Sequence, residues 1–172
     1  MVKTITTMRI VLLGDAGAGK TSWLDRFTTG SFDPRYIPNY FPSSHDVMLE
    51  LNDSTIDQHE VVFKIVDTPG QKLYQPNIFR DICVDADAII IFYDLTSEIG
   101  WKNCVEWEKL AKSYNPNAQI VNVGSKADIE PFILRERPLP HYHVSAKSNY
   151  NYYKPLLAIA QHLLHNPDIR FV

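Results

Sequence analysis

Eight residues near the start of the chain have the types and spacing that a phosphate-binding loop needs. The run reads Gly14-Asp15-Ala16-Gly17-Ala18-Gly19-Lys20-Thr21, and Ser22 follows it. Glycine, four free positions and Gly-Lys-Thr form the P-loop pattern, in which backbone N–H groups cradle phosphates and the lysine reaches the β- and γ-phosphates. The threonine hydroxyl ligates Mg²⁺ in such loops, and a Cβ at Gly19 would crowd the phosphates. The sequence therefore predicts nucleotide contacts from Asp15 through Ser22, with Lys20 also serving catalysis and Thr21 the metal.

The residues on either side of this loop favour a strand and a helix, which is the context that the loop requires. The run 9–13 consists mainly of β-branched residues and leucine, which is typical of a buried parallel strand. The segment 21–27 contains neither Pro nor Gly and favours a helix, whose positive end would face the phosphates. Strand, glycine-rich turn and helix in this order make a chance match to the pattern a poor explanation.

Length and composition limit the class of protein. The chain has 172 residues, of which 45% are hydrophobic, and a net charge of −3, so we expect one domain over 1–172 and no nucleic-acid partner. Cys83 and Cys104 fall in segments expected to be buried or helical, which favours a reducing compartment over a disulfide framework. The chain has no membrane-length apolar run, no glycine at position 2 and no cysteine at its end. We therefore expect a soluble intracellular protein without a membrane anchor.

Apolar runs and helical periodicities alternate along the rest of the chain. The expected strands are 9–13, 46–51, 60–66, 88–93, 119–123 and 143–145, and the further expected helices are 101–113 and 155–164. This alternation predicts an α/β fold with helices on both faces of the sheet. Strands 46–51 and 60–66 flank a turn at 52–57 and are expected to form a hairpin. The pattern predicts a six-stranded, mostly parallel sheet with one antiparallel strand at its edge.

A second group of chemically suited residues follows the expected strand 60–66. Asp67 stands at the strand end, where a carboxylate can hold Mg²⁺ through a water. Gly70 would let its backbone N–H approach a γ-phosphate, and Gln71 could orient an attacking water. At this offset after a P-loop, Asp-Thr-Pro-Gly-Gln predicts a metal ligand at Asp67 and a catalytic residue at Gln71.

Two further motifs follow later strands and favour guanine as the base. Ser125-Lys126-Ala127-Asp128 supplies a carboxylate that can accept hydrogen bonds from guanine N1 and N2, a donor pair that adenine lacks. The aliphatic part of Lys126 can lie over the base. In Ser145-Ala146-Lys147, a backbone N–H can bond guanine O6. Because ligands bind at the carboxyl ends of parallel strands, we expect all these motifs at one edge of the sheet.

Together, these motifs resemble those of the Ras superfamily of small GTPases, and they cover nearly the whole chain. Within the superfamily the chain is most similar to the Ran family and next to the Rab family. The Ran likeness rests on the run from Ser145 through Ser148-Asn149-Tyr150-Asn151 and Lys154-Pro155 to Phe171-Val172. It implies a three-layer P-loop NTPase fold that binds GTP or GDP with Mg²⁺. It also implies slow GTP hydrolysis as a molecular switch in nucleocytoplasmic transport.

The resemblance further implies roles for individual segments and partners. Phe32 would pack edgewise near the guanine, Tyr36 would lie in the first switch loop, and 71–80 would form the second switch. The implied partners are an exchange factor, an activating protein and transport receptors such as importins, in nucleus and cytoplasm. We identify no internal arginine finger, so intrinsic turnover would be on the order of 10⁻⁴ per second. We expect a monomer because the sheet and helices account for the apolar positions.

Four departures from the family pattern bear on mechanism. Asn39 stands where the family has the Mg²⁺-ligating threonine of the first switch, and its side-chain oxygen could still ligate the metal. Pro69 replaces an alanine and lacks an N–H. Ser125 replaces an asparagine, and losing one or two hydrogen bonds would cost about 1–3 kcal/mol in binding. The short segment 128–145 contains three prolines, which predicts a shortened fourth helix.

These departures leave more than one hypothesis open. The first is a Ran-like GTPase that switches slowly between its GTP and GDP states. The second is a degenerate guanine-nucleotide-binding interaction protein with impaired switching or hydrolysis, which Asn39 and Ser125 motivate and Gln71 opposes. A third, another P-loop enzyme such as a small-molecule kinase, would need an arginine-rich lid, and the sequence offers none.

Overall fold

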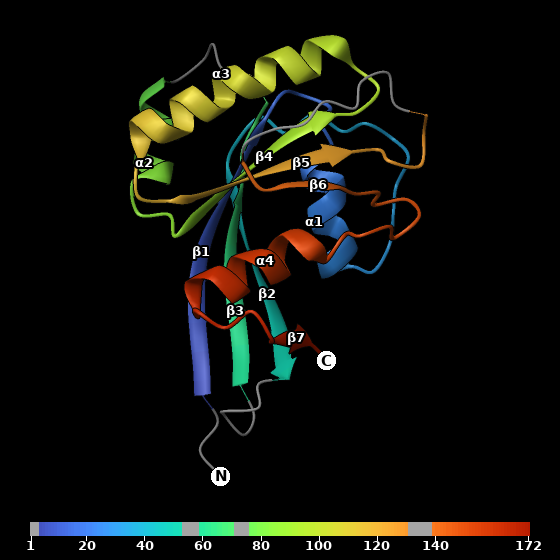
Figure 1. Cartoon of the computed structure of the whole chain (residues 1–172). Coiled ribbons are helices and arrows are strands. Elements are labelled where there is room, and N and C mark those ends of the chain that lie inside the picture. The colour runs from blue at the N-terminus through green and yellow to red at the C-terminus, as the bar shows by residue number, and fades with distance from the viewer. Residues whose placement is uncertain (1–3, 53–58, 71–75, 131–138) are drawn as a thin grey trace.

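The computed structural model describes residues 4–52, 59–70, 76–130 and 139–172. Its strands are β1 (Thr4–Gly14), β2 (Ser43–Asn52), β3 (His59–Asp67), β4 (Ala88–Asp94), β5 (Gln119–Ser125), β6 (His141–His143) and β7 (Arg170–Phe171). Its helices are α1 (Lys20–Thr28), α2 (Pro76–Cys83), α3 (Glu98–Tyr114) and α4 (Lys154–Leu163). The strands form one sheet in the order β6-β5-β4-β1-β3-β2-β7 (Figure 1). Neighbours from β6 to β3 are parallel, whereas β2 is antiparallel to both β3 and β7.

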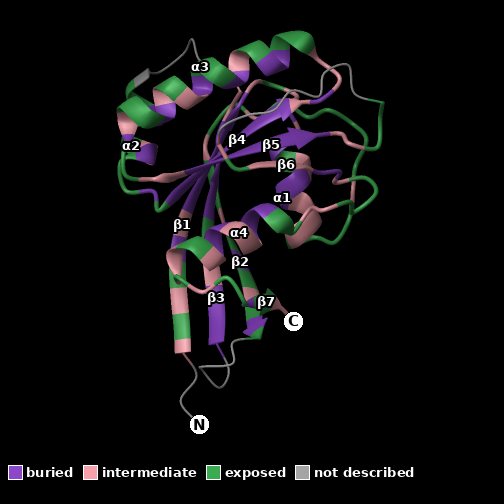
Figure 2. Cartoon of the chain, viewed as in Figure 1, coloured by how far each residue is buried: buried purple, intermediate pink, exposed green. Residues whose placement is uncertain are grey.

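The sheet is covered on both faces, as the alternation of elements predicts. Figure 1 shows α2 and α3 on one face and α1 and α4 on the other. Successive side chains of β1 serve the two cores in turn, because neighbouring residues of a strand point to opposite faces. Ile10 and Leu12 pack in the cluster under α1 and α4, whereas Val11 and Leu13 pack in the cluster under α2 and α3. Burial on both faces explains why 10–13 is a continuous apolar run (Figure 2).

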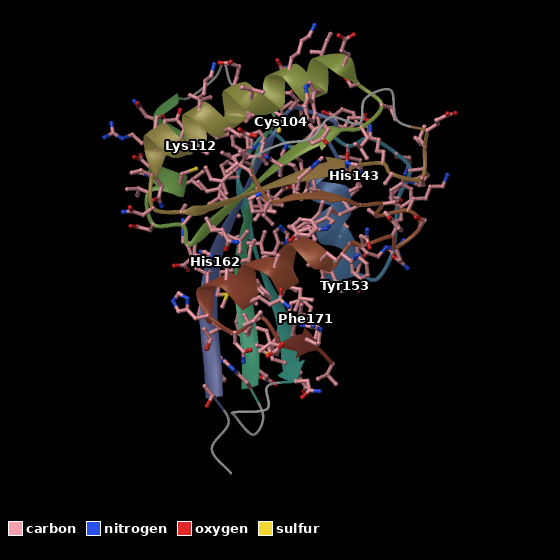
Figure 3. The ribbon with its side chains drawn as sticks, viewed as in Figure 1. Cys104, Lys112, His143, Tyr153, His162 and Phe171 are labelled. Carbon is pink, nitrogen blue, oxygen red and sulfur yellow. The ribbon has the colours of Figure 1, made fainter. Side chains whose placement is uncertain are left out.

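Helix α3 covers the second of these cores along its whole length. It begins after Ser97, whose Oγ accepts a hydrogen bond from the Gly100 N–H at 3.1 Å. This cap starts the helix at Glu98, three residues before the expected Trp101. Cys104 lies on the buried side of α3 (Figure 3), and neither Cys83 nor Cys104 forms a disulfide. Burial raises the pKa of the Cys83 thiol to about 12, so this group stays protonated and unreactive.

The expectation of six strands with β2 at the edge was wrong, because a seventh strand covers β2. The pair Arg170–Phe171 bonds to Leu51 and Asn52, and the N–H of Val172 donates to the Glu50 carbonyl at 3.0 Å. Two residues are too few for strand periodicity, so the sequence carries no signal of β7. Tertiary packing holds it instead: the ring centroids of Phe171, labelled in Figure 3, and Phe63 lie 6.1 Å apart in an edge-on contact.

Two other segments differ from the expectation or lie beyond it. Strand β6 spans His141–His143, two residues before the expected 143–145. Helix α2 was not expected as a helix, because 71–80 was assigned to the second switch. The shortened fourth helix was placed between Asp128 and Ser145, and 131–138 lie outside the described residues.

Candidate nucleotide-binding site

The turn that follows β1 depends on glycine at both of its ends. Gly14 has φ +138°, and a Cβ there would fall 2.3 Å from the Phe92 carbonyl oxygen of β4. Gly19 has φ +87° and caps α1 without a side-chain hydrogen bond. The first N–H groups of α1 therefore have no capping side chain, and they point out of the helix end where an anion binds best.

Lys20 is buried and folded back onto the loop that it follows. Its Nζ donates to the carbonyl oxygens of Gly14 at 2.8 Å and Asp15 at 3.0 Å. Burial lowers the pKa of the Lys20 ammonium to about 8, although Asp67 and Asp15 act in the opposite direction. A buried ammonium with only neutral acceptors gains from an approaching phosphate, so this geometry suits anion binding.

Asp67 gathers the residues expected to serve the metal. The Thr21 hydroxyl donates to Asp67 Oδ2 at 2.6 Å, and Asn39 Nδ2 donates to the same oxygen at 3.2 Å. The other oxygen, Oδ1, is buried and has no hydrogen-bond partner among the described residues. Oxygen donors and an unpartnered buried carboxylate oxygen fit Mg²⁺ or one of its waters. The Asn39 side-chain oxygen instead accepts from the Phe41 N–H at 3.3 Å.

Gly70 presses the loop after β3 against the P-loop. A Cβ at Gly70 would fall 1.9 Å from the backbone nitrogen of Ala16. Only glycine therefore permits this approach, which keeps the Asp67–Gly70 turn close to the predicted phosphate position. Gln71, the predicted catalytic residue, lies outside the described residues.

The predicted base-binding residues also meet one another. The Ser145 hydroxyl donates to Asp128 Oδ1 at 2.6 Å and accepts from the Ser148 N–H at 3.0 Å. The Lys126 ammonium donates to the Asp94 carboxylate at the end of β4. The backbone of Lys126 has a positive φ of +61°. Burial alone would raise the pKa of Asp94, but hydrogen bonds from Lys126 and Thr96 hold this pKa below its usual value. Asp94 is thus a charged anchor for Lys126.

Ser125 lies directly against the P-loop. A Cβ on Gly19 would lie 3.2 Å from both Cβ and Oγ of Ser125, so the two loops are in van der Waals range. The Ser125 hydroxyl is buried and makes no hydrogen bond among the described residues. The expectation that serine loses a hydrogen bond of the longer asparagine side chain stays a prediction for the nucleotide-bound protein.

One pocket of about 660 Å³ brings most of the predicted residues together. Its walls include Ala16, Gly17, Gly19, Lys20, Thr21, Ser22, Phe32, Tyr36, Asn39, Asp67, Gly70, Ser125, Lys126, Asp128, Ala146 and Lys147. Three other predicted residues, Asp15, Ala18 and Ser145, do not line it. The volume lies in the range of small-molecule sites. The carboxyl ends of β1, β3 and β5 and the segment after β6 thus form one concave surface.

The Asp15 side chain turns away from the predicted nucleotide position, which the sequence did not predict. Its carboxylate faces α3, where it accepts from Asn103 Nδ2 at 2.7 Å and Trp107 Nε1 at 2.9 Å. Asp15 can therefore reach a nucleotide only through its backbone. No local pattern indicates this contact, because its partners lie about ninety positions later in the chain.

The pocket wall also contains four titratable residues that the sequence motifs did not predict: Asp25, Asp33, Arg35 and His45. Asp25 follows Thr21 by one helical turn, so its place on the same face of α1 could have been predicted. Burial, and then the nearby Asp67 carboxylate, raises the pKa of Asp25. The pocket therefore carries a carboxyl group near Asp67 that the motifs alone do not indicate.

This arrangement defines a phosphate-binding α/β protein with its ligand pocket at the carboxyl edge of the sheet. The Ras family model matches residues 9–165, and the chain belongs to this family. Members are small GTPases, nucleotide-binding switches that hydrolyse GTP. Among the helices of the described residues, none combines the length and the apolar character that crossing a membrane requires.

Proposed function

We propose that residues 1–172 act as one Ran-type GTPase domain that binds GTP and GDP with Mg²⁺ and hydrolyses GTP slowly. The observation that carries this proposal is the single pocket into which the phosphate, metal and base motifs converge. Membership of the Ras family supports the switch and the reaction class. The likeness of Ser148–Asn151, Lys154-Pro155 and Phe171-Val172 to the Ran family supports the finer assignment.

Each end of the pocket has a proposed role in the reaction. The P-loop amides and Lys20 hold the phosphates, and Gln71 orients the attacking water. Thr21 and Asp67 hold Mg²⁺, which would neutralise charge on the phosphate oxygens. At the other end, Asp128 reads guanine N1 and N2, and the backbone of Ala146 and Lys147 reads O6. The Ser145–Asp128 bond of 2.6 Å supports this assignment, because it fixes the carboxylate beside the base-reading loop.

The proposed partners follow from the Ran likeness. An exchange factor and an activating protein would drive the cycle, and importin-type receptors would read its state in nucleus and cytoplasm. The loop before β2 supports a protein-binding role, since Tyr36, Tyr40 and Phe41 are all well over half exposed. We propose that the chain itself is a monomer without a nucleic-acid partner.

A second candidate is favoured by one specific contact. The Asn39 amide donates to the Asp67 oxygen that also accepts from Thr21, so it competes for a group that Mg²⁺ needs. The side-chain oxygen, which would be the ligand, is turned toward Phe41. A protein in which this contact persists would bind guanine nucleotides with little switching, as a degenerate interaction protein.

The experiment that separates the two candidates is a nucleotide titration of wild type and Asn39→Thr. GTP and GDP are titrated with and without Mg²⁺, and Asn39→Asp, which removes the amide donor but keeps the side-chain size, serves as the matched variant. In the switching protein, wild type binds GTP tightly only with Mg²⁺, and threonine changes the affinity less than threefold.

The other results have equally definite meanings. Strong preference for GDP in wild type, with GTP binding restored about tenfold or more by threonine, identifies the degenerate binder. No guanine-nucleotide binding under any condition would refute both candidates. Tight binding of ATP at the same site would refute the guanine assignment of Asp128.

A further inference from the structure

Arg26, in the last turn of α1, makes contacts that neither the family assignment nor the nucleotide motifs account for. Its guanidinium donates to three backbone carbonyls in two separate loops. Nε donates to Ala146 at 2.8 Å and Nη2 to Lys147 at 3.3 Å, both in the loop that reads the base. Nη1 donates to Gly30 at 2.6 Å, at the start of the loop that leads to Phe32. One planar side chain therefore joins the end of α1 to both loops.

These contacts fix the orientation of peptide groups in the base-reading loop. The described chain has no cis peptide bonds, so the C=O and N–H of each peptide group point in opposite directions. The Ala146 carbonyl faces Arg26, which turns the N–H of the same peptide group, that of Lys147, away from Arg26. Ala146 and Lys147 both line the pocket. The next peptide group is held at both ends, because the Lys147 carbonyl accepts from Arg26 and the Ser148 N–H donates to Ser145 Oγ at 3.0 Å.

Other contacts hold the ends of this loop but not its centre. The Ser145 N–H donates to the Tyr150 carbonyl at 2.9 Å, which closes the loop at its base. At the centre of the loop, the carbonyls of Ala146 and Lys147 both accept hydrogen bonds from the Arg26 side chain. Charge-assisted hydrogen bonds of this kind are stronger than neutral ones, and the guanidinium plane matches several acceptors at once.

We infer that Arg26 is a positioning residue for guanine recognition, which aims the backbone N–H of Lys147 at guanine O6 by holding the Ala146 carbonyl. This inference rests on the proposed guanine-nucleotide site. Arg26 does not line the pocket, so it acts through the loop that it holds. Its bond to the Gly30 carbonyl also ties the start of the loop that leads to Phe32 to the end of α1.

The test compares three ligands that differ at the base. GDP and inosine diphosphate both carry O6, whereas 6-thio-GDP carries sulfur there, a weaker acceptor, and keeps the N1 and N2 donors. Affinities with Mg²⁺ are measured for wild type, Arg26→Ala, Arg26→Lys and the matched control Arg170→Ala. Arg170 also donates to backbone carbonyls, those of Pro167 at 2.9 Å and Ile169 at 2.7 Å. Neither Arg170 nor these two partners line the pocket.

The expected result is selective for O6. Arg26→Ala weakens GDP and inosine diphosphate by a common factor on the order of tenfold, and weakens 6-thio-GDP by clearly less. Arg26→Lys recovers part of the loss, because one ammonium can reach some but not all three carbonyls. Arg170→Ala changes each affinity less than twofold.

Two results would overturn the inference. Equal loss for all three ligands would mean that Arg26 supports the fold rather than O6 recognition, and unchanged GDP affinity would remove any role. The melting temperature without nucleotide is measured for each variant, and if Arg26→Ala fails to fold, Arg26→Gln and Arg26→Lys carry the same comparison. Failure of wild type to bind GDP would instead refute the proposed function, so the two failures are distinguishable.

Discussion

Among the single residues of the pocket, Lys20 carries the largest electrostatic consequence. Its ammonium is buried, and that burial lowers its pKa from 10.5 to about 8. Because the pKa is lower in the folded state, the unfolded chain binds more protons between these two values. The nucleotide-free protein therefore gains stability as the pH rises from about 8 toward 10.5, when the buried charge is removed.

Nucleotide binding should take up a proton at Lys20 near pH 8. About half of the Lys20 side chains are neutral there in the free protein, and a bound phosphate favours the charged form. We expect GDP binding to take up roughly half a proton at pH 8.0 and clearly less at pH 7.0. The terminal phosphate is already ionised at pH 8.0, since its pKa is about 6. Calorimetric titration in two buffers of different ionisation enthalpy measures this uptake.

The absence of proton uptake at pH 8.0 would mean that Lys20 stays fully charged in the free protein. The carbonyl bonds to Gly14 and Asp15 would then outweigh the cost of its burial. Phosphate binding would in that case involve no change in the protonation of this lysine, and affinity would be flat between pH 7 and 8.

At the scale of elements, the P-loop is tied to α3 through the Asp15 carboxylate. Its two oxygens accept from Asn103 and Trp107, which lie one helical turn apart. Trp107 is almost fully buried, so its indole N–H has little access to water. The loop that holds the phosphates is therefore positioned by a helix on the opposite side from α1.

Replacing Asp15 by alanine should destabilise the protein by about 2–3 kcal/mol. The change removes the two hydrogen bonds that the Asn103 amide and the buried Trp107 indole donate to Asp15. The melting temperature should fall by roughly 4–10 °C. Asp15→Asn is the matched control, because its amide oxygen can still accept from Trp107 and the loss should be about 1 kcal/mol. A melting temperature within a degree of wild type for Asp15→Ala would show that the contact contributes little.

The sequence predicted the elements that have a local signal and missed those that depend on distant contacts. The P-loop was predicted from its motif, and β4 and α3 from an apolar run and a helical periodicity within their own residues. By contrast, β7 exists because Phe171 packs on Phe63, and Asp15 faces α3 because Asn103 and Trp107 lie there. The role of Gln71 was predicted by its spacing and stays a prediction, since this residue lies outside the described residues.

At the scale of the whole molecule, the central strands belong to two cores at once. Trp23 lies in the core under α1 and α4, whereas Trp101 and Trp107 lie in the core under α2 and α3. The strands between them contribute alternate residues to both cores, so neither core can lose its packing without disturbing the sheet. The nucleotide pocket lies at the carboxyl edge of the sheet, where residues of α1 and of the loops after β1, β3 and β5 line it.

We therefore expect the two cores to unfold in one transition. In Trp23→Phe, fluorescence reports the core under α3, and in the double variant Trp101→Phe/Trp107→Phe it reports the core under α1. Within each variant, fluorescence and far-ultraviolet circular dichroism should give the same urea midpoint. GDP with Mg²⁺ at a hundredfold excess over its Kd should raise the stability in both variants by about 2.7 kcal/mol, because the ligand binds only the folded pocket.

Separate midpoints within one variant would mean that one face of the sheet unfolds while the other persists. A ligand shift confined to one probe would place the pocket on that face alone, and the coupling of the two cores through β1, β3 and β4 would then be wrong.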